Sequence, residues 1–209
     1  MLKMTLPSSA PDENPSHKIA EAILSFIGHI PGTDEHKSRN PAKSAQSVAA
    51  SAATKAAVTA GTLALPPGPL GWLTILPELI AVWKIQAQMV VDIAAIYGKK
   101  SCLAREEMLY CLFRHLAAQA FRDLVVRVGE RFLVRRVSLR TFRTVAQKIG
   151  IRITRRVIGK GVSRWLIVIG ALGVAAYAYY DTGRVAATAI ELFERDIKLE
   201  PEPDERRNA

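Results

Sequence analysis

Apolar residues recur at the three- and four-residue spacing of an α-helix along most of the chain. The first such run begins near residue 16 and stops at a Pro-Gly pair, and it predicts a short amphipathic helix. Its apolar face comprises Ile19, Ile23, Phe26, Ile27 and Ile30. The Pro- and Ser-rich residues 1–15 are interpreted as a disordered leader, and residues 16–40 as this short helix and a linker.

Two longer helices are expected next, joined by a turn. Asn40 can cap the first of them and Pro41 suits its first helical position. The Ala-, Ser-, Thr- and Val-rich residues that follow favour a helix with thin side chains, which neighbours can approach closely. The run PPGPLG at residues 66–71 breaks this helix. A second helix is expected over 72–97, with Gly98 as its C-cap, so the pattern predicts a central apolar helical hairpin.

The second half of the chain continues the helical pattern. A full amphipathic period from Phe113 to Val128 predicts a helix. Two similar basic segments, residues 127–137 and 148–159, predict two basic helices that wrap the core. The apolar segment Trp165–Tyr180 is expected in the core, and a charged helix is expected to follow it as far as about residue 198.

These elements define the expected fold class. Runs of β-branched residues lie inside helical periods, so no strand is expected. We predict an all-α protein: a single helical domain of about six to eight helices around the apolar hairpin. This domain is expected to span residues 41–198, and residues 199–209 are interpreted as a disordered tail.

Composition excludes several classes of protein. Hydrophobic residues make up 49% of the 209 residues and charged residues 23%, which is typical of a globular chain rather than a disordered one. The two cysteines form no CxxC motif, so neither a disulfide scaffold nor a zinc ribbon is expected. The N-terminal residues do not have the apolar core of a secretory signal, which predicts a cytoplasmic protein.

Positive charge is concentrated in one region. The chain has a net charge of +10, and residues 105–164 alone hold 15 Lys or Arg against 4 Asp or Glu. Three interpretations stay open: an anionic membrane surface or a membrane protein as partner, nucleic acid, and a solvated helical face. Nucleic acid is the weakest partner, because the block has no recognised nucleic-acid motif and its phenylalanines lie on the apolar sides. The candidate contact residues are Arg127, Arg131, Arg135, Arg136, Arg152, Arg155 and Arg156.

The apolar segments raise the question of membrane insertion. As a helix, the 16 uncharged residues of Trp165–Tyr180 reach about 24 Å, short of the roughly 30 Å hydrocarbon core of a bilayer. A marginal membrane segment at 161–180 therefore stays open, as does insertion of the hairpin around residues 66–71.

A polar stripe on the second hairpin helix is the other candidate site. At 100° per residue, Glu78, Lys84, Gln88 and Asp92 share an arc of about 120° on an otherwise apolar helix. This arc is either a small-ligand or enzymatic site or the solvent-facing side of an amphipathic helix. Gln86 lies off the stripe and needs a separate partner.

Other chemistry finds little support. Cys111 and His115 are four residues apart, but two ligands do not make a metal site, and a core cysteine beside a surface histidine is expected. The phosphate-binding glycine signatures GxGxxG and GxxxxGK[ST] do not occur in the sequence. No cofactor, metal or catalytic residue is therefore predicted.

Two stretches together resemble a known family. They are AGTLALPPGPLGWLTILPELIAVWKIQAQMVVDIAAIYGK at 60–99 and IGALGVAAYAYYDTGRVAATAIELF at 169–193, and this pairing resembles the EcsC family of bacterial proteins. The resemblance implies an all-helical cytoplasmic protein linked with membrane functions and without an established reaction. We therefore expect a non-enzymatic protein associated with the inner face of the cell membrane, which docks through its basic block. The alternatives are an enzyme or ligand-binding protein that uses the polar stripe and, more weakly, a non-specific nucleic-acid-binding protein.

Overall fold

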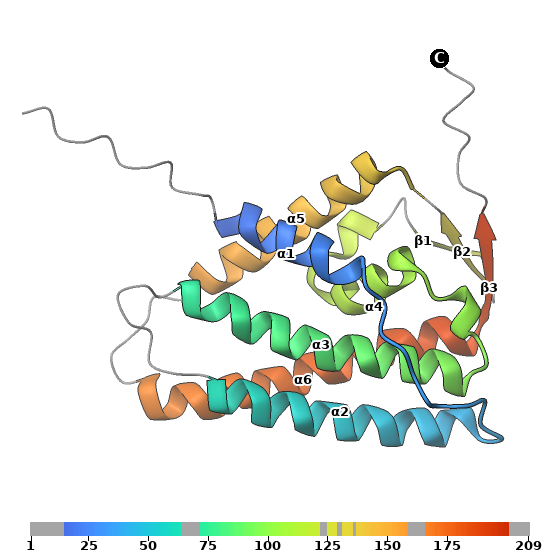
Figure 1. Cartoon of the computed structure of the whole chain (residues 1–209), viewed down its shortest axis with the longest axis horizontal. Coiled ribbons are helices and arrows are strands. Elements are labelled where there is room, and N and C mark those ends of the chain that lie inside the picture. The colour runs from blue at the N-terminus through green and yellow to red at the C-terminus, as the bar shows by residue number, and fades with distance from the viewer. Residues whose placement is uncertain are drawn as a thin grey trace, which may run out of the picture.

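The computed structural model of the protein describes residues 15–63, 72–121, 125–128, 131–135, 137–158 and 166–200. Helices dominate these residues, as Figure 1 shows. The six α-helices of the described chain are α1 (Pro15–Ile27), α2 (Pro41–Leu63), α3 (Trp72–Ile96), α4 (Arg105–Ala117), α5 (Leu139–Ile158) and α6 (Leu166–Glu194). The predicted all-α class and helix number are confirmed, whereas the leader at residues 1–14 and the tail beyond residue 200 lie outside the described residues.

Three long helices, α2, α3 and α6, pack side by side (Figure 1). The predicted start of α2 is confirmed, since the backbone N–H of Lys43 donates to the side chain of Asn40 at 3.3 Å. The predicted C-cap of α3 is confirmed as well, because Gly98 adopts φ 70° just after the helix ends. The buried face of α2 consists of alanines, and it lets α6 approach so closely that a methyl group at Gly61 would lie 3.3 Å from Cβ of Ala175.

The main core lies where α3 and α4 meet the C-terminal half of α6. Trp83 of α3 packs edge-on against Phe113 of α4, with ring centroids 5.2 Å apart. Phe193 of α6 is fully buried in the same cluster. The short helix α1 joins this core through buried isoleucines and packs on α5, so the segment before residue 41 is built into the same domain.

A small sheet lies at the end of the molecule where α6 ends. β1 (Val125–Val128) pairs antiparallel with β2 (Arg131–Arg135), and β2 pairs in parallel with β3 (Asp196–Glu200). Two short 3-10 helices, Lys100–Cys102 and Ala118–Phe121, flank α4. The sheet therefore ties the middle of the chain to the segment that follows α6.

Several expectations are wrong in detail. No strand was expected, and the helix expected to run to about residue 198 ends at Glu194, where β3 follows. The helix expected over 113–128 ends at Ala117 in α4, and the basic helix expected over 127–137 is the β1–β2 pair. Residues 171–180, expected in the core, are buried only at Ala178. In this segment Ala178 packs with Ala56 and Ala60 of α2 and Val82 of α3, whereas Leu172 and the three tyrosines stay exposed.

One helix is long and apolar enough to cross a membrane. Residues Leu76–Ile96 of α3 pass this test of length and composition among the described residues, and 61% of that window is buried inside the protein. Because α3 contributes to the protein core over this length, its hydrophobicity has a sufficient explanation in packing.

Candidate functional site

The densest cationic surface of the described chain is the outer face of α5. The helix carries six Lys or Arg and no Asp or Glu. Five of these cations are exposed: Arg140, Arg143, Lys148, Arg152 and Arg155. Within the described residues none of the five forms an ion pair with an acidic side chain. The face therefore presents uncompensated positive charge to its surroundings.

Packing explains why the cations of α5 point outward. The opposite side of the helix buries Phe142, Val145, Ala146, Ile149 and Ile153 against the core. Gly150 lies on this buried side, where its lack of a side chain lets α1 approach the backbone of α5 closely. The apolar stripe and the close crossing with α1 thus fix the rotation of the helix and with it the direction of the basic face.

The structure separates the predicted arginines into two groups. Arg152 and Arg155 belong to the exposed face of α5, and Arg156 lies on the same helix. Arg127 lies in β1 and Arg131 and Arg135 lie in β2, whereas Arg136 is outside the described residues.

The register of the sheet pairs two arginine positions of β2 with acidic positions of β3. Arg131 pairs in register with Asp196, and Arg135 pairs with Glu200. The exposed cations of α5 also include Arg140, Arg143 and Lys148, which the candidate set did not contain.

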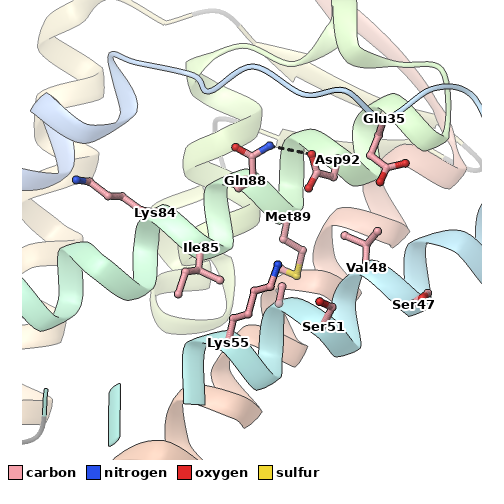
Figure 2. A pocket seen from close by; sticks show the side chains of 11 residues that line it. Glu35, Ser47, Val48, Ser51, Lys55, Lys84, Ile85, Gln88, Met89 and Asp92 are labelled. Atoms are coloured by element: carbon pink, nitrogen blue, oxygen red, sulfur yellow. Dashed lines mark hydrogen bonds between the residues drawn. The ribbon is translucent and has the colours of Figure 1, made fainter. Parts of the chain in front are cut away.

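The second candidate site is a cleft of about 580 Å³ between α2 and α3, shown in Figure 2. Three residues of the predicted polar stripe line it: Lys84, Gln88 and Asp92. In Figure 2 the side chain of Lys84 points away from the others, so it marks the rim of the cleft. The other lining residues are Glu35 from the α1–α2 connection, Ile85 and Met89 of α3, and Ser47, Val48, Ser51, Ala52 and Lys55 of α2.

Hydrogen bonds fix the wall of this cleft. Asp92 accepts a hydrogen bond from the hydroxyl of Thr33 at 2.6 Å and one from Nε2 of Gln88 at 2.9 Å. Nε2 of Gln88 also donates to the backbone carbonyl of Gly32 at 2.8 Å. The polar stripe therefore holds the α1–α2 connection against α3. Glu78 does not line the cleft; it is half-buried, and desolvation raises the pKa of its carboxyl.

A buried polar network that the sequence did not reveal links α3, α4 and α6. Nε2 of Gln86 donates to Asp181 at 3.0 Å and to the hydroxyl of Thr182 at 3.2 Å, which supplies the separate partner that Gln86 needed. The other carboxylate oxygen of Asp181 lies 2.7 Å from Nε2 of His115. The only sequence signal for this network is that Asp181 and Thr182 interrupt a long apolar run.

The expectation of a surface histidine at position 115 is wrong. The side chain of His115 is 8% exposed, because α6 covers it and places Asp181 against its ring. Cys111, one turn earlier, is fully buried as expected, and burial raises the pKa of its thiol. Among the described residues, no group of three or more His, Cys, Asp or Glu side chains is placed to hold a metal ion.

Comparison with known proteins adds no assignment to this geometry. The chain matches no family model, no curated protein and no solved structure.

Proposed function

We propose that this protein docks on the anionic surface of a membrane through the basic face of α5, as a non-enzymatic protein on the inner face of the cell membrane. The observation that carries the proposal is the row of five exposed cations on a helix without an acidic residue. Each Lys or Arg close to an anionic leaflet contributes about 1 kcal/mol of attraction. The resemblance to the EcsC family implies the same association with membranes.

Apolar residues within the basic face support lipid over a purely electrostatic partner. Ile151, near the middle of the cationic arc, is 43% exposed, and Leu139 at the start of α5 is 53% exposed. A helix with cations and exposed aliphatic side chains on one side suits the interface between headgroups and acyl chains. Nucleic acid offers no comparable apolar layer to a basic face that contains no aromatic residue.

The experiment measures co-sedimentation with vesicles of phosphatidylcholine containing phosphatidylglycerol. The test variant is the double charge reversal Arg152→Glu, Arg155→Glu, and the matched control is Arg39→Glu, Lys43→Glu, which reverses two exposed cations outside α5. Removing two attractive contacts of about 1 kcal/mol each predicts at least a thirtyfold loss of affinity for the α5 variant. The control variant is expected to bind within a few-fold of the unmodified protein.

The salt dependence of binding and competition by duplex DNA distinguish docking on lipid through α5 from binding of nucleic acid. Binding through α5 is expected to fall as salt shortens the screening length from about 10 Å at 0.1 M to about 3 Å at 1 M. Equal affinity of the two charge-reversal variants would contradict docking through α5. Displacement from vesicles by stoichiometric duplex DNA would favour the nucleic-acid alternative instead.

A second candidate function is the binding of a small polar ligand in the cleft between α2 and α3. The observation that favours it is that charges of both signs, Lys55 on one side and Glu35 and Asp92 on the other, surround one cleft with an apolar floor. A ligand that carries both an ammonium and an anionic group matches this lining. A panel of free amino acids is expected to raise the unfolding temperature of the protein, and the variant Lys55→Ala is expected to lose that increase.

A further inference from the structure

Most of the large apolar side chains that the structure describes as exposed lie at one end of the α2–α6 pair. Leu172 is 73% exposed, Val58 61% and Leu63 44%. Three tyrosines on α6 complete the set. We call this set the apolar tip: Val58 and Leu63 on α2, and Leu172, Tyr177, Tyr179 and Tyr180 on α6. Exposed apolar side chains grouped on neighbouring helices are typical of a surface that binds a partner.

The packing of α2 on α6 aligns the two halves of the tip. The helices run antiparallel (Figure 1), and the close approach of Gly61 to Ala171 and Ala175 fixes their register. Leu63 therefore lies level with the first described side chains of α6. The charged residues nearest to the tip are Lys55 on α2 and Asp181 on α6. The register of the two helices places them at nearly the same position along the shared axis. Among the described residues of α2 and α6, one plane across both helices thus separates a part without charged side chains from a part that carries them.

The size of the tip matches one leaflet of a bilayer. Leu172 and Tyr180 are separated by about 12 Å along the helix axis. A leaflet contributes about half of the roughly 30 Å hydrocarbon core. The tip is therefore long enough to enter a leaflet and too short to cross the membrane.

The residues at the boundary of the tip are of the types found at the level of the lipid headgroups. Tyrosines are enriched at membrane interfaces because the ring is apolar and the hydroxyl polar. Here Tyr179 and Tyr180 stand next to the first charges, and the guanidinium of Arg184 donates to the hydroxyl of Tyr180 at 2.9 Å. The one charged residue of α3 before Lys84 is Glu78, whose half-buried carboxyl has a raised pKa and is therefore easier to neutralise.

We propose that the protein docks end-on and inserts the apolar tip into one leaflet of an anionic membrane, with Tyr179 and Tyr180 at the level of the headgroups. This inference rests on the proposed function, because the cations of α5 supply the attraction to the surface. Figure 1 shows that the C-terminal end of α5, where Arg152 and Arg155 lie, is at the same end of the molecule as the start of α6.

Charge explains why a bilayer fits this end better than a second copy of the chain. In a symmetric dimer formed through the tips, the ends of α5 that carry Arg152 and Arg155 would be brought together from the two copies. Like charges at an interface oppose association. Anionic headgroups would instead neutralise the same cations while the acyl chains receive the apolar side chains.

The test uses an environment-sensitive fluorophore at the tip. The protein is labelled with a nitrobenzoxadiazole group through Leu172→Cys in a Cys102→Ser background; Cys111 is buried and stays unlabelled. A label introduced by Ser101→Cys in the same background marks the opposite end of α3 and serves as the control. On phosphatidylglycerol-containing vesicles the tip label is expected to shift to the blue and to be quenched by lipids with a nitroxide on the acyl chain, whereas the control label keeps its aqueous spectrum.

A substitution gives the second readout. Because Leu172 is 73% exposed, Leu172→Asn is expected to leave the free protein folded. Loss of one buried leucine weakens vesicle binding by about tenfold. The control is Ala42→Asn, which introduces the same side chain at an exposed position near the start of α2, outside both the tip and α5, and is expected to change binding less than twofold.

The outcomes distinguish the two proposals. Binding to anionic vesicles with an unchanged tip label would overturn insertion and leave docking through α5 intact. Failure to bind anionic vesicles at all would overturn both. A blue-shifted tip label in the absence of vesicles, together with a doubled mass in solution, would show that a second copy covers the tip and would overturn insertion.

Discussion

The crossing of α1 and α5 allows a sharp test of the packing, through the substitution Gly150→Ala. A methyl group at this position would lie well inside contact distance of the carbonyl oxygen of Ser16 and 3.2 Å from the backbone nitrogen of Ala20. Backbone atoms of a packed helix cannot rotate away as a side chain can. The substitution therefore forces α1 and α5 apart.

The magnitude follows from two opposing effects. Alanine is about 1 kcal/mol better than glycine inside a helix, which stabilises the variant. Overpacking a core costs about 1–3 kcal/mol, and separating two packed surfaces by even 0.5–1 Å loses about a quarter to a half of their dispersion energy. Since Ile19, Ile23 and Ile27 of α1 are all buried at this contact or beside it, we expect a net destabilisation of about 1–2 kcal/mol.

The matched control is Gly183→Ala in α6, where a new methyl group would meet no atom within 4 Å. It is expected to stabilise the protein by about 1 kcal/mol through helix propensity alone. Unfolding followed by circular dichroism measures both variants, and their unfolding temperatures are expected to differ by about 4–12 °C. If Gly150→Ala stabilised the protein as much as Gly183→Ala does, the close crossing of α1 and α5 would be refuted.

Three further predictions concern single side chains. Gln86→Ala leaves its two acceptors on α6 without a donor and is expected to cost about 1–3 kcal/mol in urea unfolding, against less than about 0.5 kcal/mol for the exposed Gln147→Ala. In native protein at pH 8 a thiol reagent is expected to modify Cys102 first, because burial raises the pKa of Cys111; equal reaction of both thiols would contradict its burial. Burial also raises the pKa of Glu78, so its contribution to stability is present at low pH and is lost as the pH rises through the folded-state value. Glu78→Gln is therefore expected to stabilise the protein more at pH 7 than at pH 4, and an equal effect at both would exclude the raised pKa.

Local signals in the sequence predicted the α2–α3 hairpin well. A capping asparagine before Pro41 and a glycine at position 98 are chemical requirements of helix ends, and they act over a few residues. The polar stripe was also predictable from local spacing. A rotation of 100° per residue places Lys84, Gln88 and Asp92 on one side of α3 wherever that helix packs. The residues that α2 contributes to the cleft depend on how two helices lie together, and no local pattern encodes that.

The sheet was not predicted because the apolar residues of its segment fit the spacing of a helix as well as that of strands. Apolar residues between positions 113 and 128 fit a helix, yet the runs in β1 and β2 are separated by only two residues that begin with Gly129, which is a hairpin signal. The pairing partner that completes the sheet, β3, lies some 60 residues further along the chain than β2. For the same reason the burial of His115 was not predictable, since Asp181 reaches it from a distant helix.

The alanine face of α2 has a consequence for synthesis on the ribosome. Its partner α6 begins about a hundred residues later, so at about 5–20 residues per second α2 waits roughly 5–20 s before that face is covered. During this interval, an exposed face of leucine or isoleucine would favour non-specific association with other nascent chains. Alanine gives little apolar area to an accidental contact and still permits the close approach that α6 requires. The small side chains that keep the finished helix pair tight also protect the unfinished chain from aggregation.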